Sequence, residues 1–289
     1  MGAADIVPGV SGGTVALVLG IYDRLINNVR LGGRGLKQLL TGDISSFKET
    51  LVRIEWVWLI SLLVGILAAV AALSSVLEQL LDDEPVKMSA LFIGLVVGTI
   101  YVAIRMLDRI DATTVAIMLG VGVALFLLLG LKSDTVVADD AAEVVTHSPL
   151  IFFLVGAIAI CAMILPGISG SFLLVMMGMY TEVLGAINDR DVVSLGAFVV
   201  GAVIGLALFS TLLHWLLDGF HNWVIAAMVG LMLGSTRVLW PWPNGTNTTT
   251  LSAPADDVAF PLLLAAVGVV VVIAVEMLST KLSAAEEGA

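Results

Sequence analysis

The sequence predicts an all-α integral membrane protein built as an inverted repeat, in which each half is a re-entrant helical hairpin followed by three transmembrane helices. The first observation is composition: 59% of the 289 residues are hydrophobic and 13% are charged, with a mean hydropathy of +1.08, whereas soluble domains are about half apolar and a quarter charged. The second is a Pro-Gly-x-Ser-Gly motif that occurs twice within apolar sequence, at 8–12 and 166–170. Such a break frees backbone groups that need partners in lipid, so its repetition indicates a transport site made from broken helices.

The repeat extends beyond the two motifs. Residues 4–22 align with residues 162–180 at an offset of 158. The identical positions include Pro8, Gly9, Ser11, Gly12, Gly20 and Tyr22, aligned with Pro166, Gly167, Ser169, Gly170, Gly178 and Tyr180. Further along the chain, Gly94, Leu95 and Gly98 align with Gly230, Leu231 and Gly234 at an offset of 136. The offset changes because the connector 23–55 is longer than its counterpart at 188–191.

Hydropathy and the motifs together place the elements. The first half, 1–131, is predicted to contain a hairpin at 2–22, a cytoplasmic connector at 23–55 that carries a surface helix, and spans at 56–80, 88–107 and 112–131. The second half, 149–281, is predicted to contain a hairpin at 149–187 and spans at 192–217, 222–240 and 258–279. A hairpin returns to the side that it entered and three spans cross an odd number of times, so the halves are predicted to have opposite orientations.

The charges and tryptophans orient the spans. The connector 23–55 contains six basic residues, which the positive-inside rule places in the cytoplasm; they are Arg24, Arg30, Arg34, Lys37, Lys48 and Arg53. Both termini are then predicted to be cytoplasmic in a multi-pass protein of the cell membrane, and the sequence predicts no signal peptide. The tryptophans lie at predicted span ends, as in an aromatic belt; they are Trp56, Trp58, Trp215, Trp223, Trp240 and Trp242.

The net charge of −11 is concentrated in short connectors. An acidic periphery suits a high-salt environment and predicts a halophilic source, and it argues against nucleic acid as a partner. The single Cys161 excludes an intramolecular disulfide and a cysteine-based metal cluster. The sequence predicts no cofactor and no metal, and it does not predict an oligomeric state.

The two hairpin tips are the predicted substrate site. If each hairpin folds into two half-helices, Ser11 and Ser169 are the N-caps of the second halves. The backbone N–H groups of 11–14 and 169–172 would then be unpaired at the positive end of a helix dipole, which suits a phosphate. A ligand would be able to approach the backbone closely at Gly12, Gly13 and Gly170. Thr14 and Ser171 would add hydroxyl donors. A purely structural kink is the alternative for each motif.

Ionisable residues near the spans are further candidates, because burying them in lipid is costly. Arg24, Arg105 and Arg237 lie near the two membrane faces, where each is able to receive an anionic headgroup or to snorkel to lipid phosphates. Asp5 and Glu276 are candidates for carrying a coupling proton or sodium ion, and exposure at the interface is the alternative for Glu276.

At these residues the chain resembles the polyprenyl-phosphate transporter family, long catalogued as a domain of unknown function. The resemblance lies in ADIVPGVSGGTVALVLGIYDRLI, CAMILPGISGSFLLVMMGMY and GLMLGSTRVLWPW. It implies movement of undecaprenyl phosphate, or of a dolichyl-type phosphate in an archaeon, back to the cytoplasmic face for cell-surface glycan synthesis. Carried over by position, the residues implied are Asp5, Pro8, Gly9, Ser11, Gly12, Gly13, Thr14, Arg24, Pro166, Gly167, Ser169, Gly170, Ser171 and Arg237. The very short N-terminus departs from the family and leaves little for the first arm of the first hairpin.

Two other functions remain open at this point. Helix N-termini near the midplane would equally serve a transporter of small anions or organic acids. Undecaprenyl-diphosphate phosphatases use a similar Pro-Gly-x-Ser-Arg-Ser loop, but Gly12 and Gly170 stand where that loop has its catalytic arginine. No enzyme activity is therefore expected. In the transport hypothesis the headgroup enters near Arg237, is held between the tips and leaves toward Arg105 and Arg24, while the prenyl tail stays in lipid.

Overall fold

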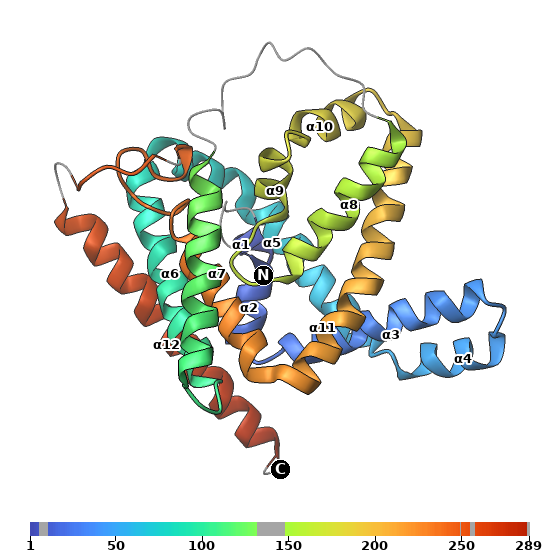
Figure 1. Cartoon of the computed structure of the whole chain (residues 1–289). Coiled ribbons are helices and arrows are strands. Elements are labelled where there is room, and N and C mark those ends of the chain that lie inside the picture. Colours follow the sequence, from blue (N-terminus) through green and yellow to red (C-terminus); the bar gives the residue numbers. More distant parts are fainter. Residues whose placement is uncertain (6–10, 132–147, 249, 255–257, 288–289) are drawn as a thin grey trace.

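The computed structural model describes residues 1–5, 11–131, 148–248, 250–254 and 258–287. Within these residues the elements are α-helices and one 3-10 turn, and none is a strand. Figure 1 shows long helices crossing the molecule, with shorter broken helices near its centre. The prediction of an all-α membrane protein is confirmed.

The helices of the predicted first half are α1 (Gly2–Asp5), α2 (Gly12–Val18), α3 (Tyr22–Leu40), α4 (Ile44–Arg53), α5 (Trp56–Asp83), α6 (Pro85–Arg105) and α7 (Ala112–Gly130). Those of the second half are α8 (Pro149–Ile164), α9 (Gly170–Met176), α10 (Tyr180–Asn188), α11 (Val192–Ser235), η1 (Gly245–Asn247) and α12 (Ala259–Glu287). Among the described residues, five helices are long and apolar enough to cross a membrane, namely α5, α6, α7, α11 and α12.

The two spans predicted at 192–217 and 222–240 are the two limbs of α11, which has 44 residues in all. Its backbone leaves helical geometry at Phe220 (φ −138°, ψ 38°), and the helix turns back there as two limbs (Figure 1). The break lies in the interval between the two predicted spans, so the chain turns back where the sequence predicted it to. The second limb ends at Ser235 instead of 240.

The first hairpin ends earlier than predicted, because Tyr22 already belongs to α3. Gly20 makes the turn with a φ of +67°, and Gly178 makes the corresponding turn between α9 and α10 with a φ of +71°. Glycine adopts these left-handed values without steric cost. The connector is helical as predicted, but it carries two helices: α3 and α4 form an antiparallel arm (Figure 1), and α3 buries Ile26 and Leu31.

The second and third spans of the two predicted halves pack reciprocally. In one contact α6 lies along α12, where a Cβ on Gly94 would collide with the backbone of Ala265. In the other, the second limb of α11 lies along α7, where a Cβ on Gly230 would come within 2.6 Å of the Met118 carbonyl oxygen. Small residues permit such close helix contacts in membranes. The reciprocity agrees with the predicted repeat, whose inverted orientation stays a prediction.

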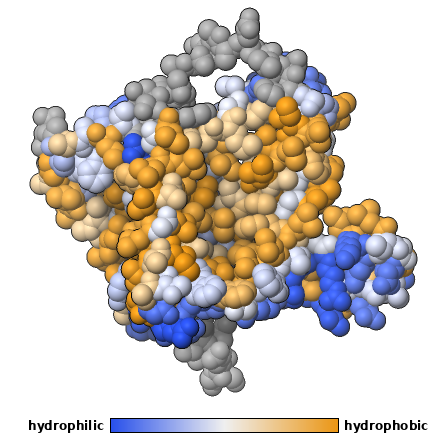
Figure 2. All heavy atoms as spheres, viewed as in Figure 1, coloured by the Kyte–Doolittle hydropathy of each residue, from blue (hydrophilic) through white to orange (hydrophobic). Residues whose placement is uncertain are grey.

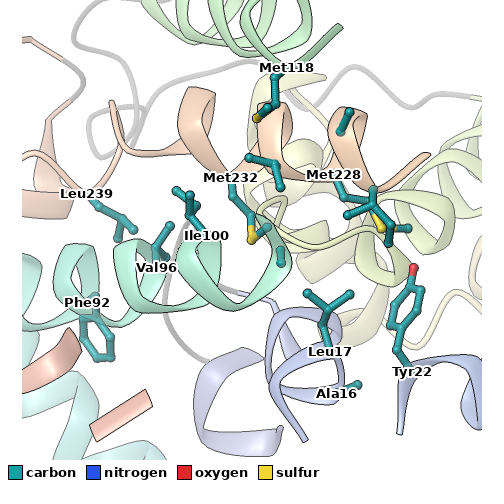
Figure 3. Packing of buried hydrophobic residues seen from close by; sticks show 14 of the residues in the cluster. Ala16, Leu17, Tyr22, Phe92, Val96, Ile100, Met118, Met228, Met232 and Leu239 are labelled. Atoms are coloured by element: carbon teal, nitrogen blue, oxygen red, sulfur yellow. The ribbon is translucent and has the colours of Figure 1, made fainter. Parts of the chain in front are cut away.

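The main buried core lies chiefly between α2, the start of α3, α6 and α11. Leu17 of α2 and Tyr22 of α3 point toward Met228 and Met232 of α11, with Val96 of α6 beside them (Figure 3). The outer surface is the reverse of a soluble protein's, because a broad apolar surface lies between hydrophilic margins (Figure 2). Apolar side chains exposed to lipid carry no hydrophobic penalty, because that penalty arises only in water.

Candidate functional site

The residues that follow the first Pro-Gly motif meet the second Pro-Gly break at the centre of the molecule. Three hydrogen bonds join the first hairpin and the start of α3 to the second break. The Ser11 hydroxyl donates to the Met163 carbonyl oxygen (3.0 Å), the Gly167 N–H donates to Thr14 Oγ1 (3.2 Å), and the Tyr22 hydroxyl donates to the Ile164 carbonyl oxygen (3.1 Å). The two tips are therefore in direct contact and close enough to share one ligand.

Both serines are N-caps, as predicted. Ser11 precedes α2 with extended backbone, and its Oγ accepts a hydrogen bond from the Gly13 N–H at 3.1 Å. Ser169 precedes α9 with extended backbone as well. Pro8 and Gly9 lie outside the described residues, and so does the side chain of Ser171.

Asp5 covers the tip of the first hairpin. Its Oδ1 accepts a hydrogen bond from the Gly12 N–H at 2.6 Å, and a Cβ on Gly12 would meet the same carboxylate. The Thr14 N–H donates to the Ser11 carbonyl oxygen. The prediction that the N–H groups of 11–14 are unpaired was therefore wrong for Gly12, Gly13 and Thr14. The physical reason is that α1 supplies the Asp5 carboxylate to Gly12 where an external anion was expected, while Ser11 itself accepts from Gly13 and Thr14.

A cavity of about 230 Å³ lies between the tips, α8 and the first limb of α11. Asp5, Ser11 and Ser169 provide its polar groups, and both serines are buried. Apolar side chains such as Phe198 complete the lining, and no positively charged side chain is found among the described residues that line it. Hydroxyl and backbone N–H groups are able to hold phosphate oxygens, whereas an ionised Asp5 would repel them.

Arg24 lies outside this cavity, at the base of the α3–α4 arm. Its Nε donates to Glu55 Oε2 at 2.9 Å, and its guanidinium lies 4.6 Å from the centre of the Trp58 ring. Buried Asn28, which the sequence did not single out, donates to Glu55 Oε1 at 3.1 Å and accepts from the Glu55 N–H at 2.9 Å. Hydrogen bonds from Arg24 and then from Asn28 lower the pKa of Glu55. No local pattern identified Asn28, because its partner is 27 residues away.

Arg105 and Arg237 also lie away from the cavity lining. Arg105 is paired with Glu276 at 3.8 Å, so two residues with separately predicted roles form one contact between α6 and α12. The Arg237 guanidinium lies 4.9 Å from the centre of the Phe126 ring on α7. The structure thus brings together the predicted residues of the two tips and leaves the three arginines and Glu276 nearer the faces.

Comparison with known proteins identifies the family. Residues 1–256 match the family described as VCA0040-like, undecaprenyl phosphate translocase-like. The chain belongs to this family. It is 38% identical over 242 residues to a polyprenyl-phosphate transporter of Vibrio cholerae, covering 84% of this chain and 75% of the relative. It is 30% identical over 252 residues to a polyprenyl-phosphate transporter of Staphylococcus aureus, covering 83% of each. No solved structure matches it significantly.

Family membership confirms the resemblance found in the sequence. The match spans both Pro-Gly motifs and the long apolar helices α5, α6, α7 and α11. The protein is a multi-pass membrane protein of a family of lipid-carrier transporters.

Proposed function

We propose that this protein moves a polyprenyl phosphate across the membrane by holding its phosphate in the cavity between the two hairpin tips. The observation that carries the proposal is the Gly167–Thr14 hydrogen bond, which joins the second motif to the helix after the first, beside a cavity lined by Ser11 and Ser169. The names of the two relatives support the substrate. An unneutralised charge in lipid costs several kcal/mol, and groups that hold the phosphate lower this barrier.

The arrangement of the hairpins supports access from both sides. After its tip the first hairpin leads to α3, and the second leads to α10, at the opposite face of the molecule (Figure 1). In the proposed cycle the headgroup enters near Arg237, reaches the cavity and leaves toward Arg105 and Arg24. The basic α3–α4 arm then marks the cytoplasmic side, with both termini cytoplasmic.

Asp5 is the proposed coupling group. An ionised Asp5 and a phosphate in one cavity repel each other, and Asp5 also occupies the Gly12 N–H. A proton on Asp5 removes the repulsion and weakens its hold on that N–H, so the amide becomes available to the phosphate. Proton binding and substrate binding are therefore linked in the proposed cycle. Glu276, paired with Arg105, is the second candidate for a coupled ion.

The proposal is transport without hydrolysis. Gly12 and Gly170 leave the cavity without the arginine of the phosphatase loop, and the described lining contains neither a histidine nor a second carboxylate beside Asp5. These are the groups that general acid–base chemistry on a diphosphate would use.

The test is a flipping assay in vesicles with a fluorescent polyprenyl phosphate. Wild type and Ser61→Ala, a control on the exposed surface of α5, should move the lipid. Ser11→Ala/Ser169→Ala and Arg237→Ala should move it much more slowly. A wild-type rate equal to that of protein-free vesicles overturns the proposal. Release of phosphate from a polyprenyl diphosphate would indicate an enzyme, and uptake of inorganic phosphate without lipid movement would indicate a small-anion transporter.

A further inference from the structure

Two apolar grooves lie beside the hairpin tips. The first, here called the α11 groove, has a volume of about 490 Å³ and lies between α7, the residue before Pro166 and both limbs of α11. The second, the α6 groove, has a volume of about 280 Å³ and lies between α1, α2, α5, α6 and α12. Apolar side chains dominate both linings. Neither groove belongs to the phosphate cavity.

The two grooves are equivalent in the internal repeat. Their linings share positions that correspond at the same offset of 136 that relates the paired glycines. These positions are Leu77, Phe92 and Leu95 in the α6 groove, and Leu213, Met228 and Leu231 in the α11 groove. An accidental packing defect would have no reason to recur at corresponding positions, so the grooves are a feature of the repeated unit.

Each groove reaches one of the hairpins that hold the cavity. The α11 groove reaches Leu165, which directly precedes the Pro166–Gly167 turn and lies four residues before Ser169 of the cavity. The α6 groove reaches Thr14, which accepts the hydrogen bond from Gly167. The meeting point of the tips therefore connects the two grooves.

The grooves lie toward opposite faces of the molecule. The α11 groove extends to the bend of α11, where the Phe220 ring stacks on Trp223 with ring centres 5.3 Å apart. The loop after α6 lies at this same bend, since the Asp108 N–H donates to Asn222 Oδ1 at 2.9 Å. The α6 groove runs along the middle of α6 and contains Leu77, in the last turns of α5 before the α5–α6 turn, and hence extends toward the other face. The two grooves thus extend toward different faces of the molecule.

We propose that these grooves hold the first isoprene units of the carrier's prenyl chain, one groove for each leaflet. The inference rests on the proposed function and extends it, since the tail is bound by protein as well as by lipid. Methionine and aromatic side chains adapt to a branched, unsaturated chain. A phosphate at the tips has an apolar channel on either side, so the headgroup and the adjoining isoprene units pass from one groove to the other together.

The test fills each groove with a bulky side chain. Leu216→Trp fills the α11 groove, and its control is Leu212→Trp, one turn earlier at a position that is 47% exposed and outside the lining. Val271→Trp fills the α6 groove, and its control is the neighbouring Val270→Trp, which is 64% exposed and outside the lining. Each groove variant should slow flipping of polyprenyl phosphate by about tenfold or more, since displacing about two buried CH₂ groups changes an equilibrium by that factor. The controls should keep the wild-type rate.

A second measurement needs no variant. Polyprenyl phosphate with a photoreactive group on its first isoprene units should crosslink, in wild-type protein, to peptides of both grooves. Wild type that does not flip the lipid refutes the proposed function itself. Wild type that flips it, with groove variants as fast as their controls and crosslinks spread over the outer faces of α5 and α12, refutes only the grooves. Loss of flipping and crosslinking in one groove alone overturns the pairing by leaflet.

Discussion

The backbone N–H of Gly167 donates a hydrogen bond to Thr14 Oγ1, 3.2 Å away, and thereby fastens the second Pro-Gly motif to the helix that follows the first. Gly167 has a φ of +89°, and a Cβ there would come within 2.8 Å of the Met232 backbone. Thr14 is buried. The two broken hairpins consequently form one unit, although 153 residues separate the bonded groups.

Replacement of Thr14 by valine tests this bond. Valine has nearly the same shape but accepts no hydrogen bond, so the buried Gly167 N–H loses its partner at a cost of about 1–3 kcal/mol. The melting temperature of Thr14→Val in detergent should fall and flipping should slow. Thr14→Ser keeps the hydroxyl and should retain most of both. An unchanged melting temperature in Thr14→Val would show that the bond contributes nothing.

Asp5→Asn separates capping from proton binding. The asparagine oxygen still accepts from the Gly12 N–H, but the side chain no longer ionises. Flipping by Asp5→Asn should lose its dependence on pH, whereas Asp5→Glu should retain a pH dependence. The measurement is the initial flipping rate over a pH series in vesicles. A wild-type pH profile in Asp5→Asn would exclude Asp5 as the coupling group.

Glu55 should give the arm an acid-sensitive stability. Hydrogen bonds from Arg24 and Asn28 lower the pKa of Glu55, so its ionised form is favoured in the folded state. This contribution is present above the ordinary pKa of a glutamate and is lost as the pH falls through the lowered value. The melting temperature of Glu55→Gln should lie below that of wild type at neutral pH, with the difference shrinking in acid. Glu49→Gln, on the exposed side of α4, is the control, and a difference independent of pH would contradict the prediction.

Gly94→Ala should disrupt the contact between α6 and α12. The added Cβ would collide with the Ala265 backbone, which has no flexible end to move aside. Overpacking of this kind costs about 1–3 kcal/mol. Gly120→Ala on α7, where a Cβ meets nothing within 4 Å, is the matched control and should be neutral. Equal melting temperatures for the two variants would show that the helices separate easily at Gly94.

Local and repeated features of the sequence predicted much of the fold. Long apolar runs predicted the crossing segments because the lipid requirement acts on each helix separately. The doubled Pro-Gly-x-Ser-Gly predicted two broken helices, and the capping preference of serine correctly placed Ser11 and Ser169. The sequence predicted a break between 217 and 222, where Phe220 lies. It did not show whether this break is a loop or a bend, because polar residues look the same in both.

The sequence by itself therefore determined the membrane-protein class, the broken helices and the family, since each is written in short segments or in their repetition. Only the tertiary structure decided that Asp5 caps Gly12, that Arg105 faces Glu276 and that α7 and α12 pack across the predicted halves. The Arg105–Glu276 pair and the packing of α7 and α12 join residues far apart in the chain. Such contacts depend on which helix faces meet, and hydropathy does not specify this. Asp5 is close to Gly12 in sequence, but its direction depends on how α1 folds against α5.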